Sequence, residues 1–233
     1  MKTIKLLLVE DDINLCYILK SSLEDVMGGY EVDVASNGEE GLEHLKSFSP
    51  DVIVSDVEMP VLNGFEMVKK IRQTNLDLPV IFATGKINPK DVTSGYEIGA
   101  DNYIKKPFTP EELDAHIKTL INIKNNSSLR LKSAVHTIGK YTFEPKKLAL
   151  TYLDSEKIKL TAKESQILEL LVQHKGEVVK REDFLVTFWE KMDTFFASRS
   201  LDVFITKLRG YLSKDASVSI VNIKPVGLIL DFS

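Results

Sequence analysis

The sequence predicts an α/β domain built on a doubly wound parallel sheet, followed by a smaller α+β domain. Over the first 123 residues, short apolar and β-branched runs alternate with longer helical patterns, which is typical of a parallel sheet covered by helices on both faces. Beyond residue 136, short strand patterns come first, three helical patterns follow, and two more strand patterns end the chain. With 233 residues and 43% apolar composition, the chain is long enough for two separate cores.

Five strand patterns and five helical patterns alternate along the first domain. The helical pattern after the first strand places Leu15, Leu19 and Leu23 on one face. Strands are expected at 4–9, 31–35, 52–55, 80–83 and 102–105, and the later helices near 38–48, 65–72, 89–98 and 110–123. This order is (βα)₅, and in such a sheet functional side chains gather at the carboxyl ends of the strands.

A polar segment at 124–128, which has no hydrophobic periodicity, predicts a linker. We therefore expect a first domain at 1–123, a linker at 124–135 and a second domain at 136–233. In the second domain, strand patterns are found at 141–143, 148–152 and 157–160, and a hairpin pattern at 219–224 and 228–231.

Charge divides the chain at the same place. Residues 1–123 carry 12 Lys and Arg against 21 Asp and Glu, a net charge of −9, whereas residues 124–233 carry 18 against 13, a net charge of +5. Only the second part suits a polyanion such as nucleic acid, and a solvated basic face explains the excess equally well by itself.

The sequence has no feature of a membrane or secreted protein. No apolar run approaches the roughly 20 residues that span a bilayer, and the first residues lead straight into a strand pattern rather than a signal peptide. We expect a soluble, cytoplasmic protein. Its single cysteine, Cys16, falls in an apolar helical pattern, which indicates a packed thiol in the core.

Four carboxylates follow two of the predicted strands. Glu10, Asp11 and Asp12 follow the first strand, and Asp56 follows the third, so a parallel sheet brings them to one edge. Such a cluster is electrostatically unfavourable unless a hard divalent cation such as Mg²⁺ binds there. The simpler alternative is that Asp11 or Asp12 caps the next helix, which would leave Asp56 unexplained.

Two more polar residues follow later strands: Thr84 after the fourth and Lys106 after the fifth. A hydroxyl and an ammonium group beside a carboxylate can hold the oxygens of a phosphoryl group, so that Asp56 can act as a nucleophile near a metal. Taken singly, each is as well explained as an ordinary residue at a strand end.

The motifs of residues 3–123 resemble the receiver domain of two-component response regulators, which has a flavodoxin-like fold. They are LVEDD at 8–12, SDVEMP at 55–60, NGF at 63–65, Thr84, GADNY at 99–103 and KPF at 106–108. The resemblance implies that Asp56 accepts a phosphoryl group from a sensor histidine kinase. It also implies that Glu10, Asp11 and the backbone carbonyl of Glu58 help to place Mg²⁺.

The same resemblance gives roles to three residues of the later strands. Thr84 and Tyr103 become the switch pair that responds to phosphorylation. Lys106 contacts the phosphoryl group, and the Lys106–Pro107 bond is expected to be cis.

The second domain resembles the winged helix-turn-helix of the OmpR/PhoB subfamily over residues 136–232. The matching segments are LTAKE at 160–164, GEVVKRE at 176–182 and RSLDVFITKLR at 199–209. RSLD at 199–202 and VNI at 221–223 are most similar to regulators from Bacteroidetes. The resemblance implies promoter DNA as a partner.

One helical pattern of this domain is the candidate for reading DNA. Its apolar stripe consists of Leu201, Ile205, Leu208 and Leu212, so its other face is free to enter a major groove. Lys207 and Val203 are candidates for base edges, and phosphates are assigned to Trp189, Arg199, Ser200, Thr206 and Arg209. Each of these residues has the ordinary alternative of a solvated surface position.

The wing departs from the usual subfamily pattern, which has two glycines around the turn. Here the turn contains Pro225 and only Gly227, and Pro225 restricts the conformation that would carry Lys224 into the minor groove. Gly210 also replaces a usual basic residue late in the helix, which removes one phosphate contact.

These observations predict a phosphorylation-controlled transcriptional regulator rather than an enzyme. Expected partners are a histidine kinase, double-stranded DNA, RNA polymerase and a second copy of the chain, on DNA or on phosphorylation; no membrane is expected. An Mg²⁺-dependent phosphatase is a rival, but such enzymes place two aspartates after the first strand, whereas Asp56 follows the third. A constitutive DNA-binding regulator with weak phosphorylation control remains the alternative.

Overall fold

The computed structural model describes residues 3–85, 88–130, 135–153, 155, 157–189 and 194–232. The chain divides into two compact units, residues 1–122 and 123–233. The predicted boundary at residue 123 lies one residue from this division.

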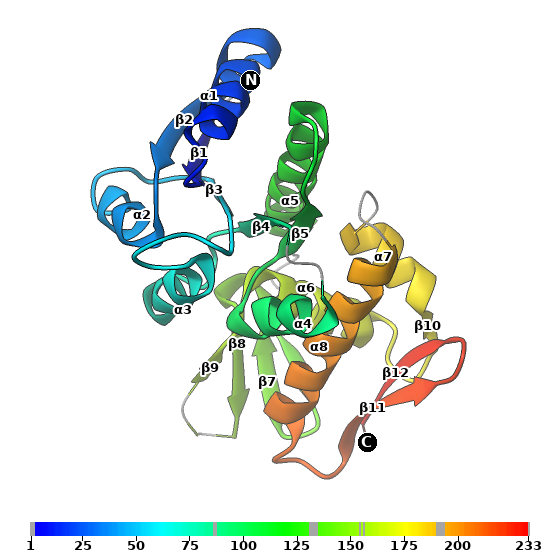
Figure 1. Cartoon of the computed structure of the whole chain (residues 1–233). Coiled ribbons are helices and arrows are strands. Elements are labelled where there is room, and N and C mark those ends of the chain that lie inside the picture. Colours follow the sequence, from blue (N-terminus) through cyan, green and yellow to red (C-terminus); the bar gives the residue numbers. More distant parts are fainter. Residues whose placement is uncertain are drawn as a thin grey trace. The chain divides into compact units, whose positions relative to one another are not determined.

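The first unit contains a sheet of five parallel strands in the order β2-β1-β3-β4-β5 (Figure 1). Its strands are β1 (Ile4–Val9), β2 (Tyr30–Ala35), β3 (Val52–Ser55), β4 (Val80–Thr84) and β5 (Asn102–Lys105). β1 lies between β2 and β3, so the strand order reverses there. Ligands of doubly wound sheets bind outside the carboxyl ends of the strands at such a point.

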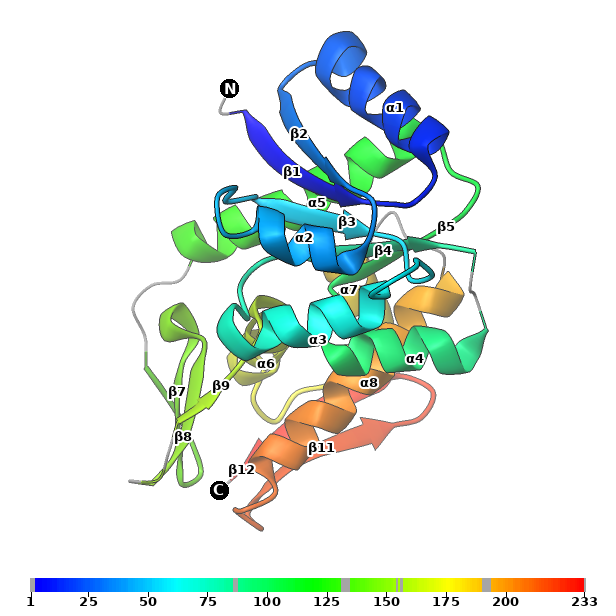
Figure 2. The same ribbon diagram turned by 60° about the vertical axis from the view of Figure 1, so that its left-hand side comes forward.

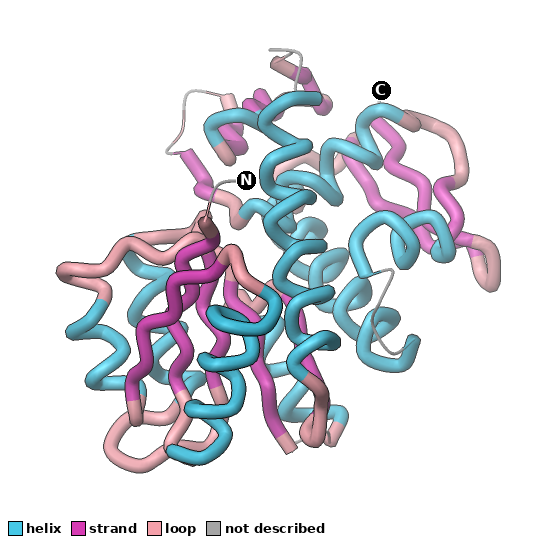
Figure 3. The backbone as a smooth tube through the Cα atoms, turned by 90° about the horizontal axis from the view of Figure 1, so that it is seen from above, coloured by secondary structure: helices cyan, strands magenta, loops and turns pink. Residues whose placement is uncertain are grey.

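Helices cover both faces of this sheet (Figure 3). They are α1 (Ile13–Ser21), continued by the π-helix η1 (Ser22–Met27), α2 (Gly38–His44), α3 (Gly64–Thr74), α4 (Pro89–Ile98) and α5 (Pro110–Arg130). Apolar side chains of α1 and α5 share one buried cluster with one face of the strands. The predicted (βα)₅ order is therefore present, and Cys16 is buried in that cluster as expected.

The helix α5 continues beyond the predicted end of the first domain. The polar segment at 124–128, expected to be a linker, lies within α5, which ends at Arg130. This part of the predicted linker is helical, because no proline or glycine interrupts the pattern and each added helical residue gains a backbone hydrogen bond. The remaining part of the predicted linker, 131–134, lies outside the described residues.

The second unit begins with an antiparallel sheet in the order β6-β7-β8-β9. Its elements are β6 (His136–Ile138), β7 (Tyr141–Glu144), the short helix η2 (Pro145–Lys147), β8 (Ala149–Tyr152) and β9 (Lys157–Lys159). Three helices follow: α6 (Ala162–Gln173), α7 (Arg181–Trp189) and α8 (Thr194–Leu212). A capping box fixes the start of α6, because Thr161 and Glu164 each accept from the backbone amide of the other.

The chain ends in the predicted hairpin, formed by β11 (Val218–Ile223) and β12 (Gly227–Phe232) (Figure 2). A short strand, β10 (Val179–Lys180), also pairs with β12 and was not predicted. A Cβ on Gly227 would lie 2.0 Å from the carbonyl oxygen of Val179, so this pairing requires glycine there. The wing thus forms around Pro225 with one glycine placed for strand pairing rather than for the turn.

No helix among the described residues combines the length and apolarity needed to cross a membrane.

Candidate functional site

Three acidic residues meet at the carboxyl edge of the first sheet. Glu10 and Asp11 follow β1 and Asp56 follows β3, and one carboxylate oxygen from each lies within 4.8 Å of the others. These two strands are hydrogen-bonded neighbours, which explains why residues 45 positions apart converge. Oxygen donors at this spacing suit a hard divalent cation such as Mg²⁺.

The next aspartate has a different task. Asp12 is the N-cap of α1, and its Oδ1 accepts from the backbone amides of Asn14 and Leu15 at 2.9 and 3.1 Å. Asp11 is exposed and belongs to the cluster. Of the two roles considered for these aspartates, helix capping belongs to Asp12, and a place in the carboxylate cluster belongs to Asp11.

Lys106 supplies the positive charge of the cluster. Its Nζ donates to Glu10 Oε2 at 2.7 Å and to Asp56 Oδ2 at 2.5 Å. Burial alone would lower the pKa of the Lys106 ammonium, but its hydrogen bonds and charge interactions with Asp56 and Glu10 raise it overall. The pKa of Glu10 is raised because burial outweighs the effect of Lys106.

The backbone after β3 also orients Asp56. Its Oδ1 accepts from the amide of Val57 at 2.5 Å and from that of Glu58 at 3.2 Å. A cavity of about 570 Å³ beside it is lined by residues that include Asp11, Glu58 and Asp91. Asp11 therefore belongs both to the carboxylate cluster and to this cavity, which Glu58 also lines.

Thr84 ends β4 at this edge, whereas Tyr103 lies near the start of β5, where it pairs with Phe82. Thr84 is buried at the end of β4, pairs with Lys105, and its carbonyl accepts from the amide of Lys106 at 3.0 Å. Tyr103 is buried, and its ring contacts those of Phe82 and Tyr96. The Lys106–Pro107 bond is cis, as expected.

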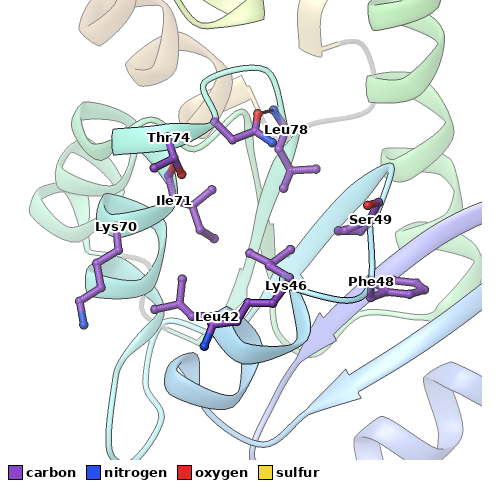
Figure 4. A pocket seen from close by; sticks show the side chains of 11 residues that line it. Leu42, Lys46, Phe48, Ser49, Lys70, Ile71, Thr74 and Leu78 are labelled. Carbon is purple, nitrogen blue, oxygen red and sulfur yellow. Dashed lines mark hydrogen bonds between the residues drawn. The ribbon is translucent and has the colours of Figure 1, made fainter.

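Figure 4 shows a second cavity in the first unit, with a volume of about 320 Å³. It is formed by the C-terminal turns of α2 and α3 and the segments that lead into β3 and β4. This position is the amino edge of the sheet, opposite Asp56, so the cavity takes no part in the acidic site.

In the second unit, the predicted apolar stripe of α8 is buried. Leu201, Ile205, Leu208 and Leu212 are each at most 2% exposed. Lys207, expected to read bases, donates from Nζ to Glu164 Oε1 at 3.1 Å, and only 19% of its side chain is exposed. Its charge is therefore already neutralised by a buried carboxylate on α6.

Two expected phosphate contacts are wrong. Ser200 is fully buried and donates its hydroxyl to the carbonyl of Phe196 at 2.7 Å. Trp189 is 3% exposed, packs against Phe188 and Phe204, and lies 5.1 Å from the ammonium of Lys163. Both side chains belong to the packing of α7 and α8 rather than to a surface that phosphates can reach.

Comparison with known families identifies both units. The model described as "Response regulator receiver domain" matches residues 6–118, and "Transcriptional regulatory protein, C terminal" matches residues 155–230. The transcriptional regulatory protein RprY of Bacteroides fragilis is 39% identical over 224 residues, which cover 96% of this chain and 93% of RprY. The chain belongs to the OmpR/PhoB-type response regulators.

Other similar proteins agree with this family. The alkaline phosphatase synthesis regulator PhoP of Bacillus subtilis is 33% identical to this response regulator over 97% of the chain and 96% of PhoP. A solved mutant of RitR has a TM-score of 0.74 at 23% identity over 98% of this chain and 99% of its own, which shows the shared fold. The similarity to RprY also agrees with the expected resemblance to Bacteroidetes regulators.

The other expected DNA contacts of this response regulator lie on α8 and the wing. Arg209 donates from Nε to the carbonyl of Ile220 at 2.9 Å, which ties α8 to β11. Thr206 is exposed, Arg199 is partly buried, and Lys224 is exposed beside the wing turn. Val203, expected to contact bases, is buried at 7% exposure. Contacts of these five residues with DNA stay predictions.

Sequence reasoning missed two residues that organise this response regulator. Glu164 binds Lys207 through one oxygen and completes the capping box through the other. The Thr-x-x-Glu pattern of a capping box at 161–164 could have indicated the second of these contacts but not the first. Gly95 lies on α4 against Tyr103, and no local sequence signal pointed to it.

Proposed function

We propose that this response regulator accepts a phosphoryl group on Asp56 from a sensor histidine kinase in an Mg²⁺-dependent reaction, and that phosphorylation controls promoter binding by the second unit. The observation that carries the proposal is the convergence of Glu10, Asp11, Asp56 and Lys106 at one sheet edge. The family membership supports the kinase and the DNA as partners.

The chemistry assigned to the site is nucleophilic. An oxygen of Asp56 attacks phosphorus, the bond from phosphorus to the kinase histidine nitrogen breaks, and an aspartyl phosphate remains. Lys106 already lies 2.5 Å from Asp56 Oδ2, so its ammonium can hold an oxygen of the incoming group. Thr84 is assigned to another phosphoryl oxygen.

Mg²⁺ fits the donor set, and it would neutralise charge on the transferring phosphoryl group. Glu10, Asp11, Asp56 and the backbone carbonyl of Glu58 are the residues that would hold it. The ammonium of Lys106 donates to one oxygen of Glu10 and one of Asp56, so it competes with the cation for these oxygens.

The DNA-binding role is assigned to α8 and the wing. Arg199, Thr206 and Arg209 are proposed to hold phosphates, and Lys224 to approach the minor groove. A base contact by Val203 would require this buried side chain to become exposed. A base contact by Lys207 would require its ion pair with Glu164 to open.

The remaining assignments follow the family. We infer a regulator without a turnover reaction of its own, which acts in the cytoplasm, pairs with a second copy on DNA or on phosphorylation, and works through RNA polymerase. A constitutive DNA-binding regulator with weak phosphorylation control is the second candidate, because it would have the same second unit.

Labelling with a small phosphodonor tests the proposal. Acetyl phosphate and Mg²⁺ should give an acid-stable, hydroxylamine-labile phosphate on the wild type and none on Asp56→Asn. Normal labelling of Asp56→Asn would contradict the assignment. Unchanged DNA affinity after stoichiometric labelling of the wild type would favour the constitutive regulator.

A further inference from the structure

Gly95 lies inside α4, where the helix passes over Tyr103. A Cβ built on Gly95 would lie 1.7 Å from the hydroxyl oxygen of Tyr103, 2.6 Å from Cζ and 2.9 Å from Cε2. Real Cβ atoms essentially never approach heavy atoms this closely. Every residue other than glycine at this position therefore excludes Tyr103 from its present place, unless α4 shifts.

The place that Tyr103 occupies is well defined. Its hydroxyl donates to the carbonyl of Asp91 on α4 at 3.4 Å, a long bond, and its ring centroid lies 5.1 Å from that of Tyr96 and 5.3 Å from that of Phe82. The side chain is 3% exposed. Burial, followed by the charge of Asp91, raises the pKa of the phenol.

A line of aromatic rings connects this place to the acidic site. Phe82 contacts Phe65 at 5.2 Å between centroids, and Phe65 follows Gly64. A Cβ on Gly64 would lie 2.1 Å from the backbone oxygen of Asp56, so the start of α3 packs directly on the backbone of Asp56. Packed rings of this kind can transmit a shift near Asp56 to the position of Tyr103.

Glycine has a cost in this helix. A glycine inside a helix loses more backbone entropy on folding than alanine does, so alanine at position 95 would favour α4 if nothing opposed it. Gly210 in α8 provides the comparison, because a Cβ there meets nothing within 4 Å. Gly95→Ala and Gly210→Ala thus share the gain in helix propensity and differ in the clash.

We propose that Gly95 is the positioning residue that admits Tyr103 beneath α4, and that this space is needed for phosphorylation of Asp56 to change the outer surface of α4 and β5. The proposal rests on the proposed function for the signal, but the steric part stands on the geometry alone. If α4 keeps its place in Gly95→Ala, the ring must move to another staggered position outside the space beneath α4.

The first experiment measures the phosphorylation of Asp56 and, separately, the change in DNA affinity on activation. Gly95→Ala should be labelled by acetyl phosphate as fully as the wild type, because Asp56, Lys106 and the carboxylates are untouched. Beryllium trifluoride should raise the affinity of the wild type and of Gly210→Ala for a duplex selected by the activated wild type. It should not raise the affinity of Gly95→Ala, and a full response of this variant would overturn the proposal.

The second experiment follows Tyr103 itself by NMR of chains labelled with ¹³C at tyrosine, assigned with Tyr103→Phe. In the wild type and Gly210→Ala, the Tyr103 signal should resist titration to high pH. In Gly95→Ala its pKa should fall toward the ordinary value. A Tyr103 that stays buried in Gly95→Ala would overturn the proposal, because the helix would then have moved instead of the ring.

Thermal unfolding supplies a test that is independent of signalling. Gly95→Ala should lower the midpoint when residue 103 is tyrosine and raise it in a Tyr103→Ala chain, whereas Gly210→Ala should raise it in both. The same sign for Gly95→Ala in both chains would overturn the steric assignment. If the wild type itself does not respond to beryllium trifluoride, the proposed function is wrong. The NMR and thermal results then still decide the role of Gly95.

Discussion

The ammonium of Lys207 on α8 lies 3.1 Å from Oε1 of Glu164 on α6, in a pair of which Glu164 is 2% and Lys207 19% exposed. The other oxygen of Glu164 accepts from the amide of Thr161 and closes the capping box of α6. One carboxylate thus joins the start of α6 to the middle of α8. Lys207 therefore belongs both to the surface expected to read DNA and to the contacts that hold α6 and α8 together.

Lys207→Ala should therefore destabilise the second unit by about 3 kcal/mol, because removing one partner leaves a buried charge uncompensated. Trp189 is the only tryptophan and is buried in this unit, so its fluorescence during urea unfolding reports the change. In a Glu164→Gln chain, which keeps an oxygen for the cap, the same substitution should cost only about 1 kcal/mol. Unchanged stability together with relaxed sequence preference would instead make Lys207 a base-reading residue.

Alanine substitutions at Asp11 and Asp12 should have different effects on stability and on Mg²⁺ binding. Asp12→Ala removes the N-cap of α1 and should lower the free energy of unfolding by about 1 kcal/mol, with labelling of Asp56 retained. Asp11→Ala should leave stability nearly unchanged and weaken Mg²⁺ binding, measured by calorimetric titration. The reverse pattern would mean that the two assignments are exchanged.

Lys106→Ala should bind Mg²⁺ about tenfold more tightly, equivalent to about 1.4 kcal/mol, because the ammonium no longer competes for oxygens of Glu10 and Asp56. Phosphorylation should nevertheless slow, because the phosphoryl group loses a cation. Lys105→Ala is the matched control, since Lys105 is exposed and adjacent. Titration calorimetry with Mg²⁺ measures both variants, and equal or weaker binding by Lys106→Ala would refute the competition.

Tyr30 should make stability depend on pH in the alkaline range. Burial and a hydrogen bond to Asp114 at 2.7 Å raise its pKa above the ordinary 10.0 in the folded chain. Its contribution is complete below pH 10 and falls as the pH rises further, because the unfolded chain then releases a proton that the folded chain keeps.

The slope of unfolding free energy against pH, measured by urea unfolding above pH 10, should therefore be less negative in Tyr30→Phe. Some slope should remain, because burial also raises the pKa of Tyr103 and Tyr211. Tyr17→Phe is the control, since Tyr17 is 75% exposed. An identical slope in Tyr30→Phe and the wild type would show that Tyr30 does not carry the effect.

Local patterns were sufficient to predict the first unit and its acidic site. Alternating strand and helix periods predict a parallel sheet, and a parallel sheet brings the residues that follow its strands to one edge. For this reason Glu10, Asp56 and Lys106, which are far apart in the chain, could be grouped from their positions alone. The end of α5 could not be predicted so well, because polar residues without proline or glycine are compatible with both a helix and a linker.

What the sequence determined by itself is the order of elements, the apolar stripes and the set of residues that follow each strand, because these depend on periods within single segments. Tertiary structure alone decided how wide each buried face is and which side chains meet. Ser200 and Trp189 are buried because α8 packs against both α6 and α7, which a stripe on one helix does not reveal. Lys207 is paired, and Gly95 must be glycine, because Glu164 and Tyr103 approach them from other elements. Such contacts depend on how helices and strands pack in space, and no period along the chain records them.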